Sequence, residues 1–470
     1  MRDYSYEGVM SRMSEIIKNA VSVDYNTFER MGYFDYEALM GSVPYSLEEV
    51  EKILHGMHVG NTPIVYMDNL TKLARKVSPK GMGARIFVKD EAQNPSGSFK
   101  ARRAALSCYE AKRLGYKGTV AATSGNYGAA VACMSAKLGL DCIVVQECFD
   151  SRGFGQPEIL EKQRKCEALG AEVIQLTVGP ELFYETLKLL EETGFYDASL
   201  YSATAIAGVE TLGAEIVRQF QDMEGKEPDV VIATNAGGGN LTGTARGMRK
   251  AGAKHTKIYA ASVDLSGLHM ASDHDFNRKS FTTGHTGFGI PFAVQPDRSD
   301  VKRSAARPLR YMDAYMLMKQ GEVFYITEAL AALEGMERGP AGNVSLAAAF
   351  ALAQTLPEDQ TIVVQETEYT GAGKHPMPQL TFAKENGVEV LFGDPEEEIP
   401  GKNIILPDHP SRIKARYYDL RKLRKSALKR YVESMEKIAA EEVAYLKSEL
   451  NCDEAFLKEA LAELGRKIEA

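Results

Sequence analysis

The sequence predicts an α/β protein whose mainly parallel sheet structure is covered by helices on both faces. Three observations predict this fold class. Short apolar strands alternate with helical stretches from Pro63 onward, turn residues bound the strands, and polar glycine-containing turns stand where strands end and helices begin. The chain has 470 residues, which is too long for one compact core, so two or three domains are expected.

The expected elements can be placed by their periodicity. The predicted strands cover residues 84–89, 119–122, 141–146, 172–176, 230–234, 257–263 and 361–365. The predicted helices cover residues 100–114, 127–138, 159–169 and 242–251. Residues 1–60 are expected to form a helical N-terminal extension, 393–402 a linker, and 403–470 a helical C-terminal extension. The basic run at 414–430 is expected to be a solvated or partner-facing helix.

Composition excludes several function classes. A net charge of −8 argues against broad nucleic-acid binding, and the sequence has no apolar run long enough to span a bilayer. The first twenty residues lack the features of a signal peptide, so a cytoplasmic protein is expected. The six cysteines form no CxxC pair and are expected to be reduced, with Cys148 in a loop after a strand.

The first chemical signal is the turn at residues 94–100, Asn-Pro-Ser-Gly-Ser-Phe-Lys. Lys100 opens a helix, where the helix dipole disfavours a cation. The same field lowers the pKa of the amine and favours its attack on an aldehyde. The alternative is a surface lysine whose stem lies along the protein.

Two further turns precede predicted helices. Residues 123–128 (Thr-Ser-Gly-Asn-Tyr-Gly) offer backbone N–H groups and the Ser124 hydroxyl to a carboxylate, although an ordinary helix-capping turn has the same composition. Residues 235–243 (Asn-Ala-Gly-Gly-Gly-Asn-Leu-Thr-Gly) can wrap closely around a phosphate; the alternative is a flexible loop. Thr242 stands where a dinucleotide fingerprint requires its last glycine, and no P-loop Gly-Lys-Ser/Thr follows.

In this order, the three turns resemble those of fold-type II enzymes that use pyridoxal 5′-phosphate (PLP), such as threonine synthase, serine and threonine dehydratases, cysteine synthase and the tryptophan synthase β chain. Residues 89–103 resemble the lysine motif of that family, and the resemblance covers residues 61–392. It implies two open, mainly parallel twisted sheets. Residues 61–100 and 205–392 would form a large PLP-binding domain, and 101–204 a small α/β domain.

The resemblance also implies roles for individual residues. Lys100 would be catalytic and would carry PLP as a Schiff base. Cofactor binding would further involve Asn126 at the phenolic oxygen, the phosphate loop and Thr370 at the pyridine nitrogen, with Glu366 and Glu368 open as alternatives to Thr370. The phosphate loop comprises Gly237, Gly238, Gly239, Asn240 and Leu241. The substrate carboxylate would be bound by Ser124, Gly125 and Tyr127.

The terminal extensions and the basic segments resemble those of coenzyme A-dependent thiolases within this family. This resemblance implies cleavage of 2-amino-4-oxopentanoate with coenzyme A to acetyl-CoA and alanine, as the D form, in ornithine degradation. A small α subunit would be the partner, in a dimer of αβ pairs. No cysteine lies in a motif like that of ordinary thiolases, and no metal-ligand spacing occurs.

Some side chains have two readings. His285, in the glycine-rich stretch 283–289, is a candidate substrate-facing acid or base, as is His375, although the pattern favours a structural role for each. Arg303, Arg307 and Arg310 could bind coenzyme A phosphates or form a salt-bridge network.

Three rival functions are weighed against the thiolase. Another fold-type II PLP enzyme, an ammonia-lyase or dehydratase or a threonine synthase-like replacement enzyme, is the nearest. A nicotinamide-dependent oxidoreductase could use the loop at Gly237 with Asp264 on the ribose, but it leaves Lys100 unexplained. A catalytically silent partner is disfavoured by the intact lysine turn.

Overall fold

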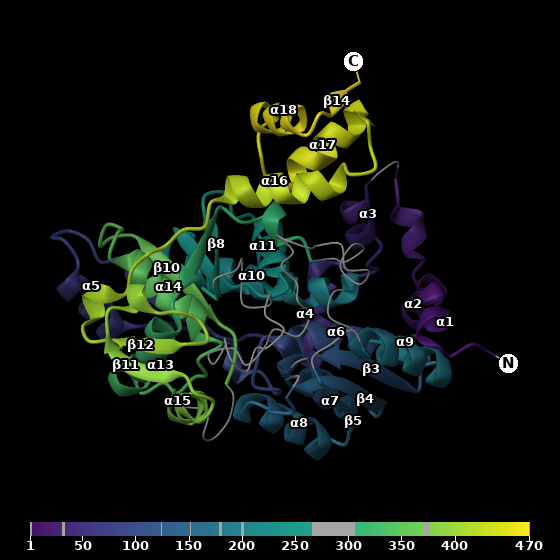
Figure 1. The fold of residues 1–470 in the computed structure, drawn as a ribbon, viewed down its shortest axis with the longest axis horizontal. Coiled ribbons are helices and arrows are strands. Elements are labelled where there is room, and N and C mark those ends of the chain that lie inside the picture. The colour runs from purple at the N-terminus through teal and green to yellow at the C-terminus, as the bar shows by residue number, and fades with distance from the viewer. Residues whose placement is uncertain are drawn as a thin grey trace.

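The structure is a computed structural model that describes residues 2–30, 33–123, 125–150, 152–177, 181–198, 202–265, 306–369 and 376–469. Two main sheets lie side by side in it (Figure 1). The larger sheet has the order β1-β2-β10-β7-β8-β9, and only β1 runs antiparallel to its neighbour. Its strands are β1 (Ile64–Tyr66), β2 (Arg85–Asp90), β7 (Val230–Thr234), β8 (Lys257–Val263), β9 (Ala314–Met318) and β10 (Thr361–Glu366).

The smaller sheet is wholly parallel, with the order β5-β4-β3-β6. Its strands are β3 (Gly118–Thr123), β4 (Asp141–Phe149), β5 (Glu172–Thr177) and β6 (Tyr196–Asp197). The predicted α/β class with two mainly parallel sheets is thus confirmed. The placement of Cys148 in a loop is wrong, because β4 continues through it past an irregularity in its pairing with β5.

Helices cover both faces of the larger sheet. Alternate strand residues pack on two separate apolar clusters, one with α5 (Asp68–Val77), α13 (Gln320–Glu334) and α14 (Asn343–Ala353), the other with α10 (Ala203–Glu224) and α11 (Gly239–Lys250). The strands of the smaller sheet contact α7 (Asn126–Leu138), α8 (Pro157–Ala168) and α9 (Glu181–Thr193). Helix α6 (Lys100–Arg113) packs on both α7 and α10 and so joins the two halves.

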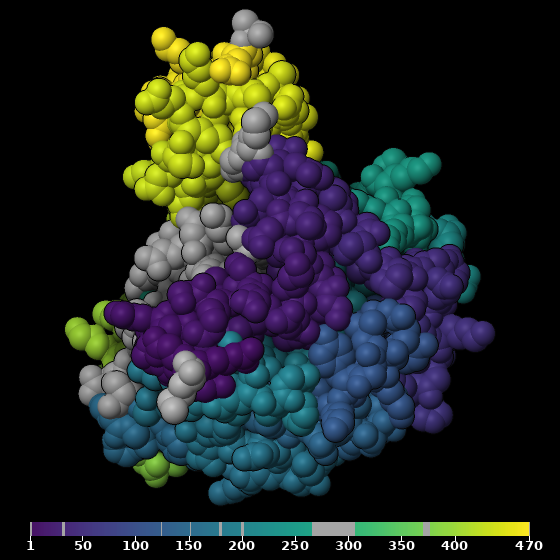
Figure 2. Space-filling view, turned by 90° about the vertical axis from the view of Figure 1, so that its right-hand side faces the viewer, coloured from purple at the N-terminus to yellow at the C-terminus, as the bar shows by residue number. Residues whose placement is uncertain are grey.

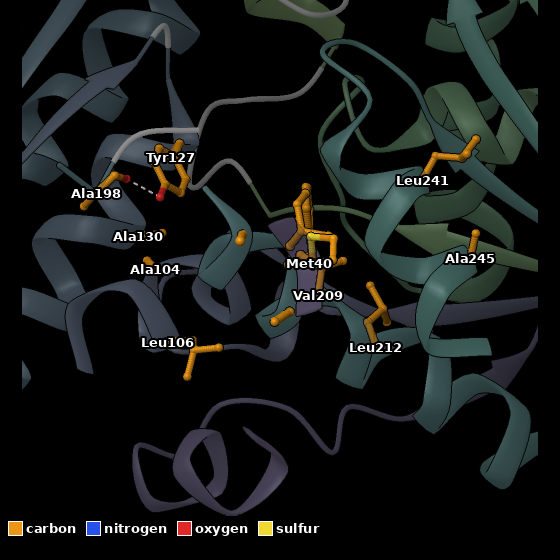
Figure 3. Packing of buried hydrophobic residues seen from close by; sticks show 14 of the residues in the cluster. Met40, Ala104, Leu106, Tyr127, Ala130, Ala198, Val209, Leu212, Leu241 and Ala245 are labelled. Carbon is orange, nitrogen blue, oxygen red and sulfur yellow. Dashed lines mark hydrogen bonds between the residues drawn. The ribbon is translucent and has the colours of Figure 1, made fainter. Parts of the chain in front are cut away.

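Glycines bring α6, α10 and α11 into backbone contact. A Cβ atom on Gly208 of α10 would lie 2.1 Å from the carbonyl oxygen of Arg102 in α6. A Cβ atom on Gly213 would lie 1.9 Å from the carbonyl oxygen of Thr244 in α11. Figure 3 shows the apolar cluster that runs through these helices. The helices that begin at Lys100 and at the glycine loop are therefore held at close range.

Helical segments at both ends of the chain lie outside the sheets. The N-terminal segment contacts α9, α6 and α10, lying across that side of the molecule in Figure 2. Its helices are α1 (Tyr6–Ser11), α2 (Met13–Val21), α3 (Tyr36–Gly41) and α4 (Leu47–Gly56). The C-terminal segment comprises α16 (Leu420–Tyr431), α17 (Ala440–Glu449), α18 (Glu454–Glu463) and the paired short strands β13 (Lys437–Ile438) and β14 (Lys467–Ile468). The ring of Tyr33 stacks on that of Tyr445, with centroids 4.2 Å apart.

Two expectations for the last hundred residues need correction. Residues 393–402 are not a free linker, because they join β11 (Glu389–Gly393) to β12 (Asn403–Pro407) in a parallel pair beside α15 (Pro376–Glu385). The buried Glu398 carboxylate fixes this segment by accepting hydrogen bonds from the backbone N–H groups of Gln320 at 2.7 Å, Gly321 at 2.9 Å and Ile405 at 3.1 Å.

The basic run at 414–430 is helical only from Leu420 onward. The N–H of Leu317 in β9 donates to the carbonyl of Arg416 at 3.0 Å, and the N–H of Tyr418 donates to Tyr315 at 2.8 Å. The backbone groups on the outer edge of β9 thus pair with this segment, which is extended. The domain boundaries expected from the sequence stay a prediction. Across the described residues, no helix is long and apolar enough to cross a membrane.

Candidate active site

The site lies where three strand ends meet. Strands β2, β10 and β7 are parallel neighbours, so their carboxyl ends share one edge of the larger sheet. The lysine turn follows β2, residues 367–369 follow β10, and the glycine loop follows β7. Ligands of open α/β sheets bind at this edge. The topology therefore places two of the three predicted turns around the end of β10.

The lysine turn is fixed by backbone hydrogen bonds to the segment after β10. The N–H of Phe99 donates to the carbonyl of Thr367 at 3.0 Å, and the N–H of Tyr369 donates to Gly97 at 2.8 Å. Gly97 has a φ of +76°, a conformation that side chains with a Cβ rarely adopt. Helix α6 then begins at Lys100, as predicted.

The charged residues of the lysine motif form a buried network under this turn. Arg102 donates to both oxygens of Glu91, at 2.7 and 2.8 Å, and to both oxygens of Glu215, each at 2.8 Å. Lys89 also donates to Glu215, at 2.8 Å. Asn94 links the network to the turn by donating to Glu91 at 2.9 Å. Burial alone would raise the pKa of Glu215, but Arg102 and Lys89 hold it well below its usual range.

Lys100 has the properties of a nucleophilic amine. Burial, together with the positive charges of Lys162 and Arg103, lowers the pKa of Lys100 to about 8, against the attraction of the Glu368 carboxylate. Its side chain is nevertheless partly exposed. Its Nζ makes no hydrogen bond or ion pair with the residues that the structure describes. The amine is therefore surrounded by protein but reachable, and it loses its proton closer to neutral pH than an ordinary lysine does, which favours its condensation with an aldehyde.

The second turn is held by Thr123. Its Oγ1 accepts hydrogen bonds from the N–H groups of Gly125 at 2.9 Å and Gly128 at 3.2 Å. Helix α7 begins at Asn126, whose side chain is partly exposed. Tyr127 points into the core, where its hydroxyl donates to the carbonyl of Ala198 (Figure 3). Only the backbone of Tyr127 is thus left for the predicted carboxylate site. Ser124 lies outside the described residues.

The glycine loop has the geometry of a phosphate site. Helix α11 begins at Gly239, after Gly238 with a φ of +88°. The first-turn N–H groups of Gly239, Asn240 and Leu241 have no acceptor within the helix, because a helix satisfies none of its first N–H groups. The buried Oδ1 of Asn240 and Oγ1 of Thr234 also have no protein partner among the described residues. The free N–H groups and the Thr234 hydroxyl can donate to the oxygens of a phosphate, whereas the Asn240 Oδ1 can only accept a hydrogen bond.

The group that faces the pyridine nitrogen stays a prediction, since Thr370 lies outside the described residues. Both carboxyl oxygens of the buried Glu366 lack a hydrogen-bond partner in the described part of the chain. Burial and the nearby Asp90 raise the pKa of Glu366 well above its usual value, although Arg338 opposes this. A Cβ atom on Gly342 would lie 1.8 Å from Glu366 Oε1, so that glycine makes room for the carboxyl group.

Sequence reasoning missed a buried ion cluster beside Lys100. Lys162 of α8 pairs with Glu158 one turn earlier, and its Nζ lies 3.8 Å from the Glu368 carboxylate. All three side chains are buried. The only signal in the sequence was a glutamate four residues before a lysine, which is typical of exposed helices. The adjacent Lys165 donates to the carbonyl of Ser96 at 2.6 Å, so α8 also touches the lysine turn.

The remaining candidates have other surroundings. Arg307 is buried and pairs with Glu449, and Arg310 pairs with Glu449 at 3.0 Å and Glu37 at 3.1 Å, so both belong to a salt-bridge network. His285, His375 and Arg303 lie outside the described residues. The cysteines are all free thiols, and burial raises the pKa of Cys452 to about 11. No cluster of metal ligands occurs in the described residues.

A reachable amine of lowered pKa and a glycine-rich helix start, both at one edge of the sheet, are the features that indicate a class of enzyme. The chain belongs to the pyridoxal-phosphate dependent enzyme family, whose model matches residues 56–368. It is therefore an enzyme whose cofactor is PLP. The salt link between Asp264 and Lys319, at 2.7 Å, also leaves the ribose role considered for Asp264 without support.

Particular relatives are more similar still. The chain is 62% identical over 466 residues to the 2-amino-4-ketopentanoate thiolase beta subunit of Acetoanaerobium sticklandii, covering 98% of this chain and 99% of the relative. It is 58% identical over 470 residues to a protein of the same name from an unknown prokaryotic organism, covering 99% and 100%. Among solved structures, a threonine deaminase from T.th. is 25% identical with a TM-score of 0.52, covering 68% of this chain and 96% of that one.

Proposed function

We propose that the chain is the β subunit of a 2-amino-4-ketopentanoate thiolase. It cleaves 2-amino-4-oxopentanoate with coenzyme A into acetyl-CoA and alanine, as the D form, in ornithine degradation. The similarity to the named beta subunits along nearly the whole chain carries this proposal, since it includes both terminal extensions. The net reaction breaks the C3–C4 bond of the substrate, forms a C4–S bond, and places the thiol proton on C3.

The residues have distinct tasks in this reaction. PLP, when bound, would accept the electron pair of the bond broken at the substrate Cα. Lys100 would hold the cofactor covalently and move the Cα proton, for which a pKa of about 8 is suited. Ser124, Gly125 and the backbone of Tyr127 would orient the substrate carboxylate. His285 would face the substrate.

Cofactor binding would depend mainly on backbone groups. The N–H groups of Gly237, Gly238, Gly239, Asn240 and Leu241 would hold the phosphate. Asn126 would bind the phenolic oxygen and Thr370 the pyridine nitrogen. Residues 61–100 with 205–392 would form the large domain and 101–204 the small one.

The name of the relatives implies an α subunit as partner. We propose a small α subunit, a dimer of αβ pairs and a cytoplasmic location. Because Arg307 and Arg310 are already paired, coenzyme A would meet other groups.

The decisive assay mixes the purified chain, loaded with PLP, with 2-amino-4-oxopentanoate and coenzyme A, with and without the α subunit. Acetyl-CoA and alanine should form in equal amounts, and Lys100→Ala should form neither. Release of ammonia from serine or threonine, or of phosphate from phosphohomoserine, without acetyl-CoA would instead identify another fold-type II enzyme.

A further inference from the structure

We infer that Lys162 supplies the positive charge that binds the carboxylate of the amino-acid substrate at Gly125. The predicted carboxylate site at the start of α7 would otherwise consist of backbone N–H groups and one hydroxyl. The inference deepens the proposed function, because it names the side chain by which the enzyme would distinguish an amino acid from a simple amine.

The first observation is position. A Cβ atom on Gly125 would lie 3.1 Å from Lys162 Cδ and 3.5 Å from Lys162 Nζ. The ammonium group therefore lies directly over the turn that opens α7, although it comes from α8 in the next unit of the smaller sheet. Only 6% of Lys162 is exposed, so its charge faces this turn rather than solvent.

The second observation is the incomplete pairing around this ammonium group. A lysine has three donors, and among the residues that the structure describes Lys162 makes one close ion pair, with Glu158. Glu368 lies 3.8 Å away, beyond hydrogen-bond distance, and its buried Oε1 has no hydrogen-bond partner among the described residues. A buried cluster that serves only stability normally satisfies all its polar atoms. Donor capacity of Lys162 therefore remains for a ligand.

The third observation is the charge around Lys100. Lys162 and Arg103 both lower the pKa of Lys100, so three cationic side chains lie close together. Glu158 and Glu368 are the two carboxylates that raise it. A substrate carboxylate at the turn would add its negative charge to this group of three cations. A carboxylate bound there would also stand beside the amine that receives the substrate.

The test uses the PLP-loaded enzyme and two amine probes, alanine as both enantiomers and ethylamine, which lacks the carboxylate. Each is titrated against the visible absorbance of the bound cofactor, without coenzyme A. For Lys162→Gln the dissociation constant for alanine should rise about 10- to 100-fold, as for loss of one charge-assisted hydrogen bond. The dissociation constant for ethylamine should change less than about threefold, since ethylamine makes no such bond.

Two companion variants keep the test decisive. Lys162→Gln combined with Glu158→Gln removes both members of the closest ion pair, so it reports on ligand binding even if the single variant folds poorly. Arg164→Gln changes an exposed cation on the same helix and should behave as the unchanged enzyme. If the preference for alanine over ethylamine survives in the double variant, or if both probes weaken equally, Lys162 does not bind the carboxylate.

The outcome is independent of thiolysis. A preference for alanine that depends on Lys162, in an enzyme that makes no acetyl-CoA, would keep this inference and reject the proposed reaction. Acetyl-CoA formation with an unchanged alanine preference in the variants would do the reverse.

Discussion

The structure predicts a large loss of stability when Arg102 is replaced. It is fully buried and donates to both oxygens of Glu91 and of Glu215. In Arg102→Met the cation left in this network would be Lys89. It donates to Glu215 but not to Glu91. Removing one partner of a buried ion pair costs about 3–5 kcal/mol, because the other charge stays buried without compensation. We expect the free energy of unfolding to fall by that amount.

Arg102→Lys is the matched control. A lysine keeps the positive charge but cannot bridge two carboxylates with paired hydrogen bonds, so we expect about half the loss. Urea unfolding of the PLP-loaded enzyme measures both variants, and cofactor retention on gel filtration shows whether the lysine turn has loosened. A loss below about 1 kcal/mol in Arg102→Met would mean that the network does not hold the turn. Because the pKa of Glu215 is lowered in the fold, its contribution should be complete at neutral pH and be lost progressively as the pH falls below the ordinary glutamate value of 4.5. Arg102→Met should weaken that acid dependence, because Lys89 alone still lowers the pKa of Glu215.

Further predictions follow from other contacts in the structure. In cofactor-free enzyme, the rate at which Lys100 condenses with added PLP should rise with pH to a midpoint near 8, because protonation blocks the amine. Lys162→Gln should move that midpoint upward, because it removes a nearby positive charge. A midpoint near the pKa of a free lysine would contradict the burial argument. The lowered pKa also means that stability should increase from pH 8 toward the ordinary lysine pKa, where only the unfolded chain is still protonated. Gly342→Ala should destabilise the protein by about 1–3 kcal/mol, because the added methyl group clashes with Glu366. Combining it with Glu366→Ala should recover most of this loss, as measured by thermal unfolding. Additive losses in the double variant would refute the clash. Glu398→Ala should cost about 2–4 kcal/mol and should speed proteolysis between β11 and β12, whereas equal cleavage rates would show that its three backbone contacts are dispensable.

Much of the fold could be predicted because its signals are local. Strands β7 and β8 have the predicted bounds, and α6 begins at the predicted lysine. The alternation of apolar strands with helices depends on neighbouring residues alone. The extended path of residues 416–418 could not be predicted in this way, because it depends on the open edge of a strand a hundred residues earlier.

The parts of the site that lie within one turn could be predicted from the sequence. The parts that depend on which side chains are buried together could not. The lysine and glycine turns are visible as unusual residue orders, and the structure places both at one sheet edge. Lys162 and Glu158 look like any helical surface pair, and only the packing of α8 against the start of α7 makes them part of the site. Their role depends on tertiary contacts that no local pattern contains.

The glycine contacts of α10 have a consequence for the tolerance of the enzyme to change. Side-chain layers between helices can be repacked by compensating substitutions, but here main chain rests on main chain at Gly208 and Gly213. The separation between the start of α6, the proposed attachment point of the cofactor, and the start of α11, its proposed phosphate site, is thereby set by the thickness of the polypeptide itself. Even a single methyl group at either glycine would push the packed helices apart. Substitutions in the surrounding sequence can therefore change the shape of the substrate site while this spacing stays constant.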